Sequence, residues 1–296
     1  MPLTFFSRSP DRAFALYFAD IHSGHKLGLL NPKAELWEED EVGDWIPYKP
    51  QLTATQAYLW QCLEEDLATV ESIARGAPIW IVHAGDLCHG DKYPEQLVST
   101  RKADQVVIAT ANVKRVLELP NIQALRLIEG TGAHTFAEGS ATILVANQLR
   151  AEHRDLDIEC RAHSLLNIWG VEMDCAHHGP SPGIRNWTAG RQLRYYVQSV
   201  MLDCLADGQN PPGALIRAHN HTGRHETVRI HTRRGTFTTE AILLPAYCGL
   251  SGYARQVTRS KYRIDIGLIL LEIIKGKIIE CHMIWRTLDL RSRETW

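Results

Sequence analysis

Five apolar segments of this chain are each followed by aspartate or histidine, and this repeated pattern constrains the fold more than any other feature. The first segment covers residues 13–19 and leads into Asp20 and His22. A short apolar run bounded by polar residues is typical of a buried strand, and alternate residues of an extended chain point to the same side. We therefore expect Asp20 and His22 to share one cation at the tip of the first strand.

The other four segments repeat this arrangement along the chain. They are residues 78–84 before Asp86, 124–128 before His134, 165–176 before His177, and 214–218 before the pair His219 and His221. In parallel α/β sheets, ligands bind at the carboxyl ends of the strands. We expect these side chains to meet at that edge, although a single strand-end aspartate or histidine more often serves a turn or the core.

Predicted helices alternate with the strands in the first half of the chain. Thr53 and Gln56 form a capping box for a helix predicted over residues 53–75. A second helix is predicted over residues 99–119 and stops at Pro120, because proline cannot continue a helix. Strands and helices in this order predict a largely parallel sheet.

The second half is richer in predicted strands. A helix is predicted over residues 187–206, and later strands over 227–231, 236–245 and 265–286 are expected to form an antiparallel second sheet. The sequence thus predicts an α/β fold of two sheets with outer helices. We expect a single domain over residues 1–296, in which residues 23–50 form a surface excursion near the site.

Composition favours a soluble cytoplasmic protein. The chain has 296 residues and 45% apolar content, which suffice for a large core. It contains no apolar run of membrane-spanning length, and residues 1–11 lack the pattern of a signal peptide, so no membrane partner is expected. The seven cysteines are odd in number and show no CxxC pairing, which argues against a disulfide framework and a thiolate zinc site.

Positive charge is concentrated between residues 217 and 263, where nine basic residues stand against two acidic ones. The basic residues are Arg217, Arg224, Arg229, Arg233, Arg234, Arg255, Arg259, Lys261 and Arg263. Such a local field favours an anionic ligand, although a solvated surface of arginine-rich hairpins explains it equally well. The net charge of −2 argues against strong binding to duplex nucleic acid, since phosphate contacts need many basic side chains.

Carboxylates and imidazoles at the same strand ends indicate a transition-metal site, redox or hydrolytic. Mixed oxygen and nitrogen ligands suit Mn²⁺, Fe, Zn²⁺ or Ni²⁺, whereas Mg²⁺ and Ca²⁺ prefer shells of oxygen alone. Two cations that share one carboxylate would clamp a phosphoryl group and lower the pKa of a water molecule between them.

The ordered set Asp-x-His, Gly-Asp, Gly-x-His, His and His-x-His, spanning Asp20 to His221, resembles the calcineurin-like metallophosphoesterases, and most closely their phage and prophage members. The resemblance implies a two-sheet β-sandwich flanked by helices (α-β-β-α) and phosphoester hydrolysis by a metal-bound hydroxide at a binuclear centre. It also implies the site residues: Asp20, His22, Asp86 and His221 for the first metal, Asp86, His177 and His219 for the second, and His134 to assist the leaving group.

The implied cofactors are two divalent transition-metal ions, manganese before iron, zinc or nickel. The basic segment favours a phosphodiester, with nucleic acid as one candidate, over a small monoester. Two other readings stay open. One is a nuclease of the DNA-repair type within the same family, and the other is a non-catalytic protein that binds a metal or a partner.

The chain departs from the family pattern at Ala133. The family usually has Gly-Asn-His there, with the asparagine amide oxygen on the second metal. Water, Thr131 or His89 could replace that oxygen, or the second metal could bind only with substrate. The Gly-Asp motif also lacks the aspartate often found three residues later, where this chain has His89, and His178 competes with His177 as the ligand.

Overall fold

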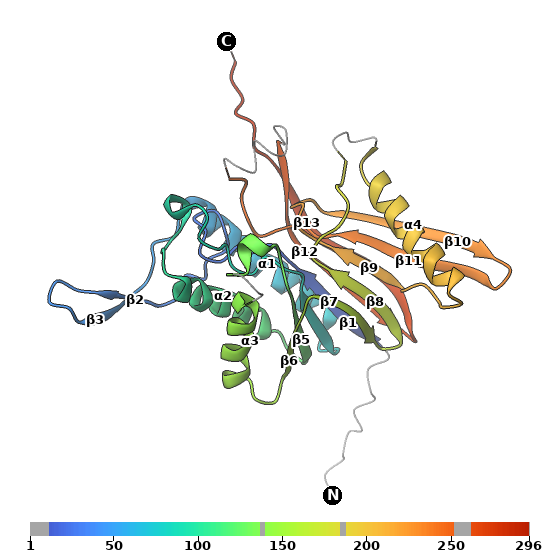
Figure 1. Ribbon diagram of the computed structural model, residues 1–296, viewed down its shortest axis with the longest axis horizontal. Helices are drawn as coiled ribbons and strands as arrows, with labels where there is room; N and C mark the ends of the chain where they lie inside the picture. Colours follow the sequence, from blue (N-terminus) through green and yellow to red (C-terminus); the bar gives the residue numbers. More distant parts are fainter. Residues whose placement is uncertain (1–11, 137–139, 184–187, 252–261, 296) are drawn as a thin grey trace, which may run out of the picture.

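A computed structural model of the protein describes residues 12–136, 140–183, 188–251 and 262–295 (Figure 1). The strands are β1 (Arg12–Phe18), β2 (Leu36–Glu39), β3 (Trp45–Tyr48), β4 (Ile79–His83), β5 (Ile122–Ile128), β6 (Asp157–Arg161), β7 (His163–Ile168), β8 (Val171–Ala176), β9 (Ala214–Arg217), β10 (Arg224–Thr232), β11 (Gly235–Leu243), β12 (Arg263–Ile274) and β13 (Lys277–Asp289). The helices are α1 (Ala54–Ala74), α2 (Lys102–Leu117), α3 (Ser140–Glu152) and α4 (Arg191–Ala206), with short 3₁₀ helices η1 (Pro94–Gln96) and η2 (Gly132–His134).

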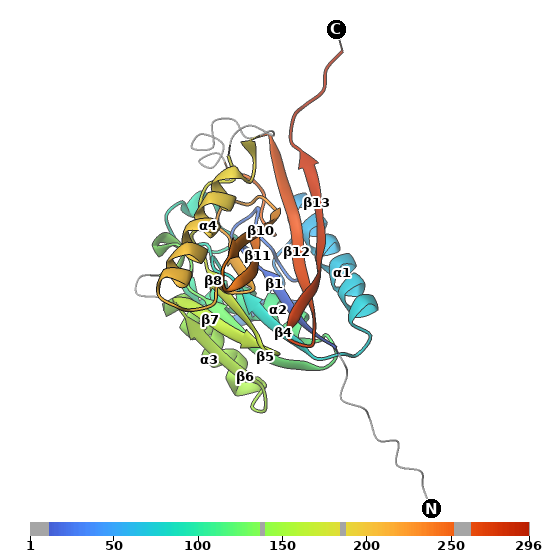
Figure 2. The ribbon, with the colours of Figure 1, turned by 90° about the vertical axis from the view of Figure 1, so that its right-hand side faces the viewer.

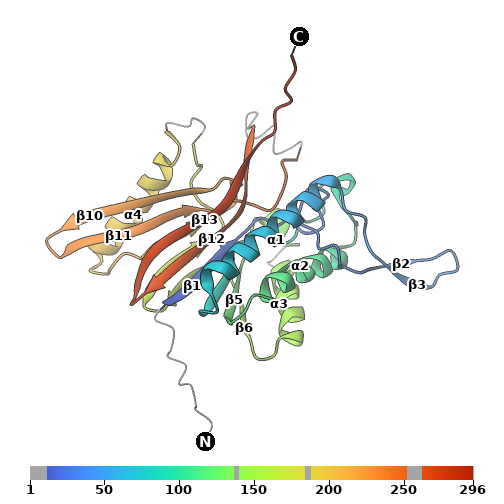
Figure 3. The ribbon, with the colours of Figure 1, turned by 180° about the vertical axis from the view of Figure 1, so that it is seen from behind.

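The strands form two large sheets and one hairpin. The first sheet has the order β13-β12-β1-β4-β5-β6, in which β1, β4, β5 and β6 are parallel and β12 pairs antiparallel with β1. The second has the order β10-β11-β9-β8-β7, with β8, β9 and β11 parallel. The hairpin β2–β3 extends from the body of the molecule (Figures 1 and 3).

The two sheets pack face to face through an apolar layer. Strand β1 shows how the sequence places it there, because it is apolar on both sides, as expected of a central strand. Ala15 and Tyr17 face the second sheet, whereas Phe14, Leu16 and Phe18 face the helices. Burial on both sides therefore fixes β1 in the middle of the molecule.

Helices cover both outer faces, so the fold has four layers. Helices α1, α2 and α3 pack on the outer face of the first sheet (Figure 3). Helix α4 packs on the outer face of the second sheet through Leu193, Val197 and Met201 (Figure 2). The α/β class predicted from the sequence is confirmed. None of the described helices is long and apolar enough to cross a membrane.

Several sequence-based predictions hold in the structure. The first sheet is largely parallel, with β1, α1, β4, α2 and β5 in the predicted order. Thr53 caps α1, and its side chain and that of Gln56 form the predicted capping box. Helix α4 begins at Arg191, after Gly190 in a left-handed conformation, while residue 187 of the predicted helix lies outside the described residues.

Two predictions about the sheets were wrong or incomplete. The last hairpin, β12–β13, was expected in the second sheet, but β12 pairs with β1 from Arg12 to Tyr17 in the first. Strand β12 has apolar residues on both faces, as a strand between a helix layer and a second sheet requires. A strand of this kind could belong to either sheet, so its sequence does not show which sheet it joins. The second sheet is mixed rather than antiparallel, and α3 and β6 were not predicted.

Candidate metal centre

The turns that follow the central strands of both sheets meet at one edge of the molecule. Asp20 N donates to Gly85 O at 3.0 Å, which joins the turns after β1 and β4. His219 N, after β9, donates to Asp20 Oδ2 at 3.1 Å, which joins the two sheets. The structure therefore brings the residues predicted from distant segments into one cluster.

The turns hold their side chains through unusual backbone conformations. Asp20, His22, Asp86, His219 and His221 all have a positive φ, between 41° and 71°. Few residues other than glycine adopt this left-handed region, and such conformations persist where the surrounding structure enforces them, often at functional sites. The prediction that Asp20 and His22 meet through strand alternation was therefore wrong in mechanism, since β1 ends at Phe18 and both residues adopt the left-handed conformation.

The side chains of His22, His221 and Asp86 lie around the carboxylate of Asp20, which is inaccessible to solvent. His221 Nε2 lies 3.4 Å from Asp20 Oδ1 and 3.2 Å from His22 Nε2. His22 Nε2 also lies 3.9 Å from Asp86 Oδ2. Asp20 Oδ1 accepts no hydrogen bond from any described residue. A buried carboxylate oxygen without a donor, facing imidazole nitrogens, fits a cation.

A second group of side chains lies on the other side of Asp86. His177 Nε2 is 3.1 Å from Asp86 Oδ2, and its Nδ1 donates to Ala84 O at 2.8 Å. His177 is 2% exposed, whereas His178 is exposed and contacts the rings of His177 and His219. The structure places His177, rather than His178, against the carboxylate.

Electrostatics favours the ligand forms of Asp86 and His22, whereas it favours the protonated form of His177. Burial raises the pKa of the Asp86 carboxyl, but the hydrogen bond from His177 and the nearby imidazoles outweigh burial and hold this pKa well below its usual range. Burial and the neighbouring His134 lower the pKa of His22. Burial also opposes the charged form of His177, yet Asp86 raises its pKa to about 9. A bound cation would replace that proton.

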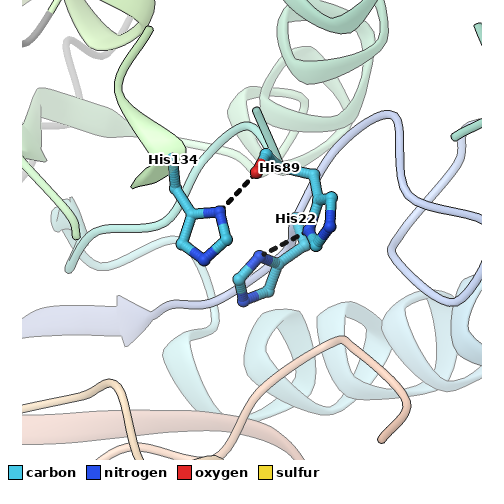
Figure 4. A group of neighbouring side chains, drawn as sticks. All are labelled: His22, His89 and His134. Carbon is cyan, nitrogen blue, oxygen red and sulfur yellow. Dashed lines mark hydrogen bonds between the residues drawn. The ribbon is translucent and has the colours of Figure 1, made fainter. Parts of the chain in front are cut away.

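His134 lies beside the cluster, in η2, with its two ring nitrogens in different surroundings (Figure 4). Its Nδ1 donates to the backbone carbonyl of His89. Its Nε2 lies 3.9 Å from Asp86 Oδ2 and is therefore directed toward the carboxylate between the two groups. Because a carbonyl oxygen can only accept a hydrogen bond, Nδ1 of His134 must carry the hydrogen in this contact.

His89 contacts the cluster in a way that its sequence position does not reveal. Its Nδ1 lies 3.3 Å from His22 Nδ1 (Figure 4), and its backbone N–H donates to Gln105 Oε1 at 3.1 Å. If His22 Nε2 holds a cation, its Nδ1 carries the proton and donates to His89. Partners of this kind orient a ligand imidazole and raise its basicity.

We expect His89→Ala to weaken binding of the first metal about 10- to 100-fold, because the Nδ1–H of His22 loses its acceptor. His89→Asn should largely preserve binding, since its amide oxygen stands near the position of the His89 Nδ1, whereas His89→Gln should not. Competition with a chromogenic chelator measures the three affinities. Equal affinities for the alanine and asparagine variants would contradict this role.

A cavity of about 410 Å³ opens beside the second group, lined among others by His177, His178 and Arg217. Arg217 is only 2% exposed and its Nη1 lies 2.6 Å from Asp174 Oδ1, so this member of the basic segment is not a surface charge. Arg224 and Arg263 line a separate cavity of about 420 Å³. Three further members, Arg255, Arg259 and Lys261, lie outside the described residues.

Comparison with known proteins adds no assignment. No protein-family profile matches the chain, and no curated protein matches it significantly. The chemistry of the site is therefore argued from its side chains.

Proposed function

We propose that this protein is a metal-dependent phosphoesterase with a binuclear centre, related to the calcineurin-like metallophosphoesterases. One observation carries the proposal: the same oxygen of Asp86, Oδ2, faces both groups of imidazoles. It lies 3.9 Å from His22 Nε2 and 3.1 Å from His177 Nε2. A carboxylate shared by two cations is the arrangement that two-metal hydrolysis of phosphoesters uses.

Each group would hold one divalent ion. The residues proposed for the first are Asp20, His22, Asp86 and His221, and those for the second include Asp86, His177 and His219. Manganese is the ion we favour, with iron, zinc and nickel as alternatives that the mixed donor set also suits. When bound, two such ions polarise the phosphoryl oxygens and lower the pKa of water.

We assign His134 the task of protonating the leaving oxygen. Its Nδ1–H is occupied by the carbonyl of His89, so Nε2 is the atom left to exchange a proton with substrate. Nε2 is directed toward Asp86, and the side chain is 21% exposed, which leaves it accessible to solvent. An imidazole held in this way suits general acid catalysis.

A phosphodiester, including one in nucleic acid, is the substrate class we favour. Arg224 and Arg263 line one cavity together with Glu226, and the excess of positive charge there would attract an anion. The net charge of −2 argues for a single strand over a duplex, because duplex binding draws on many basic contacts.

The proposal predicts hydrolysis of bis-p-nitrophenyl phosphate by the full chain supplemented with Mn²⁺, and its loss after removal of the metal with EDTA. Release of p-nitrophenolate measures the rate, with Ca²⁺ in place of Mn²⁺ as the control. Salt-sensitive cleavage of single-stranded DNA without turnover of the chromogenic diester would assign a nuclease. Absence of bound metal together with no turnover of any phosphoester would overturn the proposal in favour of a non-catalytic protein.

A further inference from the structure

We propose that the hydroxyl of Thr131 is a ligand of the second metal and supplies the oxygen that Ala133 cannot. This inference rests on the proposed two-metal site. Ala133 has no donor atom in its side chain and is exposed. Asp86, His177 and His219 alone would leave the second ion with three protein ligands.

The distances around Thr131 Oγ1 are those of ligands that share one ion. The hydroxyl oxygen lies 3.3 Å from Asp86 Oδ2, 3.3 Å from His177 Nε2 and 3.2 Å from His219 Nδ1. Asp86 Oδ2 and His177 Nε2 are themselves 3.1 Å apart. In a tetrahedral zinc site with bonds of about 2.0 Å, for example, neighbouring ligand atoms lie about 3.3 Å apart. These four separations therefore match those expected within one coordination shell.

The contacts of the Thr131 hydroxyl lie at the long end of the hydrogen-bond range. The hydroxyl has one proton and two lone pairs, and three polar atoms lie at nearly the same distance from its oxygen. The contact with Asp86 Oδ2, at 3.3 Å, exceeds the usual O–H···O distance of about 2.7–2.8 Å. The backbone N–H of Thr131 already donates to Asp86 Oδ1 at 2.6 Å, so the hydroxyl is not needed to hold that carboxylate.

The local backbone also directs this hydroxyl to the cluster. Thr131 is the residue that precedes η2, where a threonine side chain commonly caps the helix, but its hydroxyl makes no capping bond. Gly130 permits the close approach, because a Cβ at that position would lie 2.1 Å from Asp86 Oδ1. The Thr131 hydroxyl thus faces the Asp86 carboxylate instead of capping η2.

The other candidates for the fourth ligand are less well placed. His89 directs its ring nitrogen to His22, on the side of the first metal. His178 contacts the rings of His177 and His219, and it is the alternative that an experiment must separate from Thr131.

Metal content of the full chain tests the inference without measuring activity. Mn²⁺ is added to wild type and to the variants Thr131→Val, Thr131→Ser and His178→Ala. Mass spectrometry counts the ions bound to each protein, and titration against a chelator measures their affinity. Valine has the shape of threonine without its hydroxyl, and Thr131→Ala serves if valine impairs folding, which thermal unfolding would show. We expect two ions in wild type, the serine variant and His178→Ala.

In Thr131→Val, we expect the second ion to bind at least tenfold more weakly while the first binds unchanged. Retention of two ions with wild-type affinity in the valine and alanine variants would overturn the role of Thr131, as would loss of the second ion in His178→Ala alone. Wild type that binds only the first ion would also overturn it. Wild type that binds no ion would instead remove the proposed function itself.

Discussion

Asp86→Asn is expected to lower kcat/KM for a phosphodiester about a thousandfold or more. Asp86 Oδ2 faces both groups of imidazoles, so the substitution removes the shared negative charge and weakens both metals at once. Charge stabilisation by the metals amounts to several kcal/mol, and about 1.4 kcal/mol corresponds to a tenfold change in rate. Steady-state kinetics and metal analysis of the same preparation measure the two losses together.

Asp66→Asn is a matched control for that variant. Asp66 is equally buried and accepts a hydrogen bond from Tyr247 at 2.7 Å, but it lies in the contact between α1 and the first sheet. We expect it to change stability and leave metal content at two ions. An Asp86→Asn protein with the rate and metal content of wild type would exclude a shared carboxylate.

His134→Ala is expected to lower kcat about 10²- to 10⁴-fold on a diester with a poor leaving group, with metal content unchanged. The defect should shrink for p-nitrophenolate, which leaves readily without protonation. Comparing kcat for bis-p-nitrophenyl phosphate and for a dinucleotide measures this difference. A general loss of structure would affect both substrates equally.

His231→Ala provides the control for removal of an imidazole. His231 is exposed on β10, and its ring nitrogen Nδ1 lies 2.9 Å from the hydroxyl oxygen of Thr236. Its rates on both substrates should match those of wild type. Full activity of His134→Ala on the dinucleotide would remove the proposed acid from the mechanism.

The order of strands in the first sheet could be predicted because local pattern and packing agree there. The run from Phe14 to Phe18 is apolar on both sides, which is what a central strand needs, and Thr53 with Gln56 marks the start of α1. The place of β12–β13 could not be predicted, because a strand that is apolar on both faces suits either sheet.

The contacts within the site depend on features that residue spacing does not encode. The predicted residues do cluster, but the left-handed turns at Asp20 and His22 replace the extended geometry from which their proximity was predicted. Thr131 was one of several candidates from sequence, and only the three-dimensional contacts of its hydroxyl distinguish it from His89. These contacts join residues that are distant in the sequence and follow strands of different sheets, so the local sequence pattern does not determine them.

Anomalous diffraction from crystals of the full chain grown with Mn²⁺ would locate the ions directly. We expect two peaks on opposite sides of Asp86, one contacting Asp20, His22 and His221, and the other contacting His177 and His219. A map with no anomalous peak at Asp86, from crystals that contain Mn²⁺ at a saturating concentration, would contradict the binuclear centre.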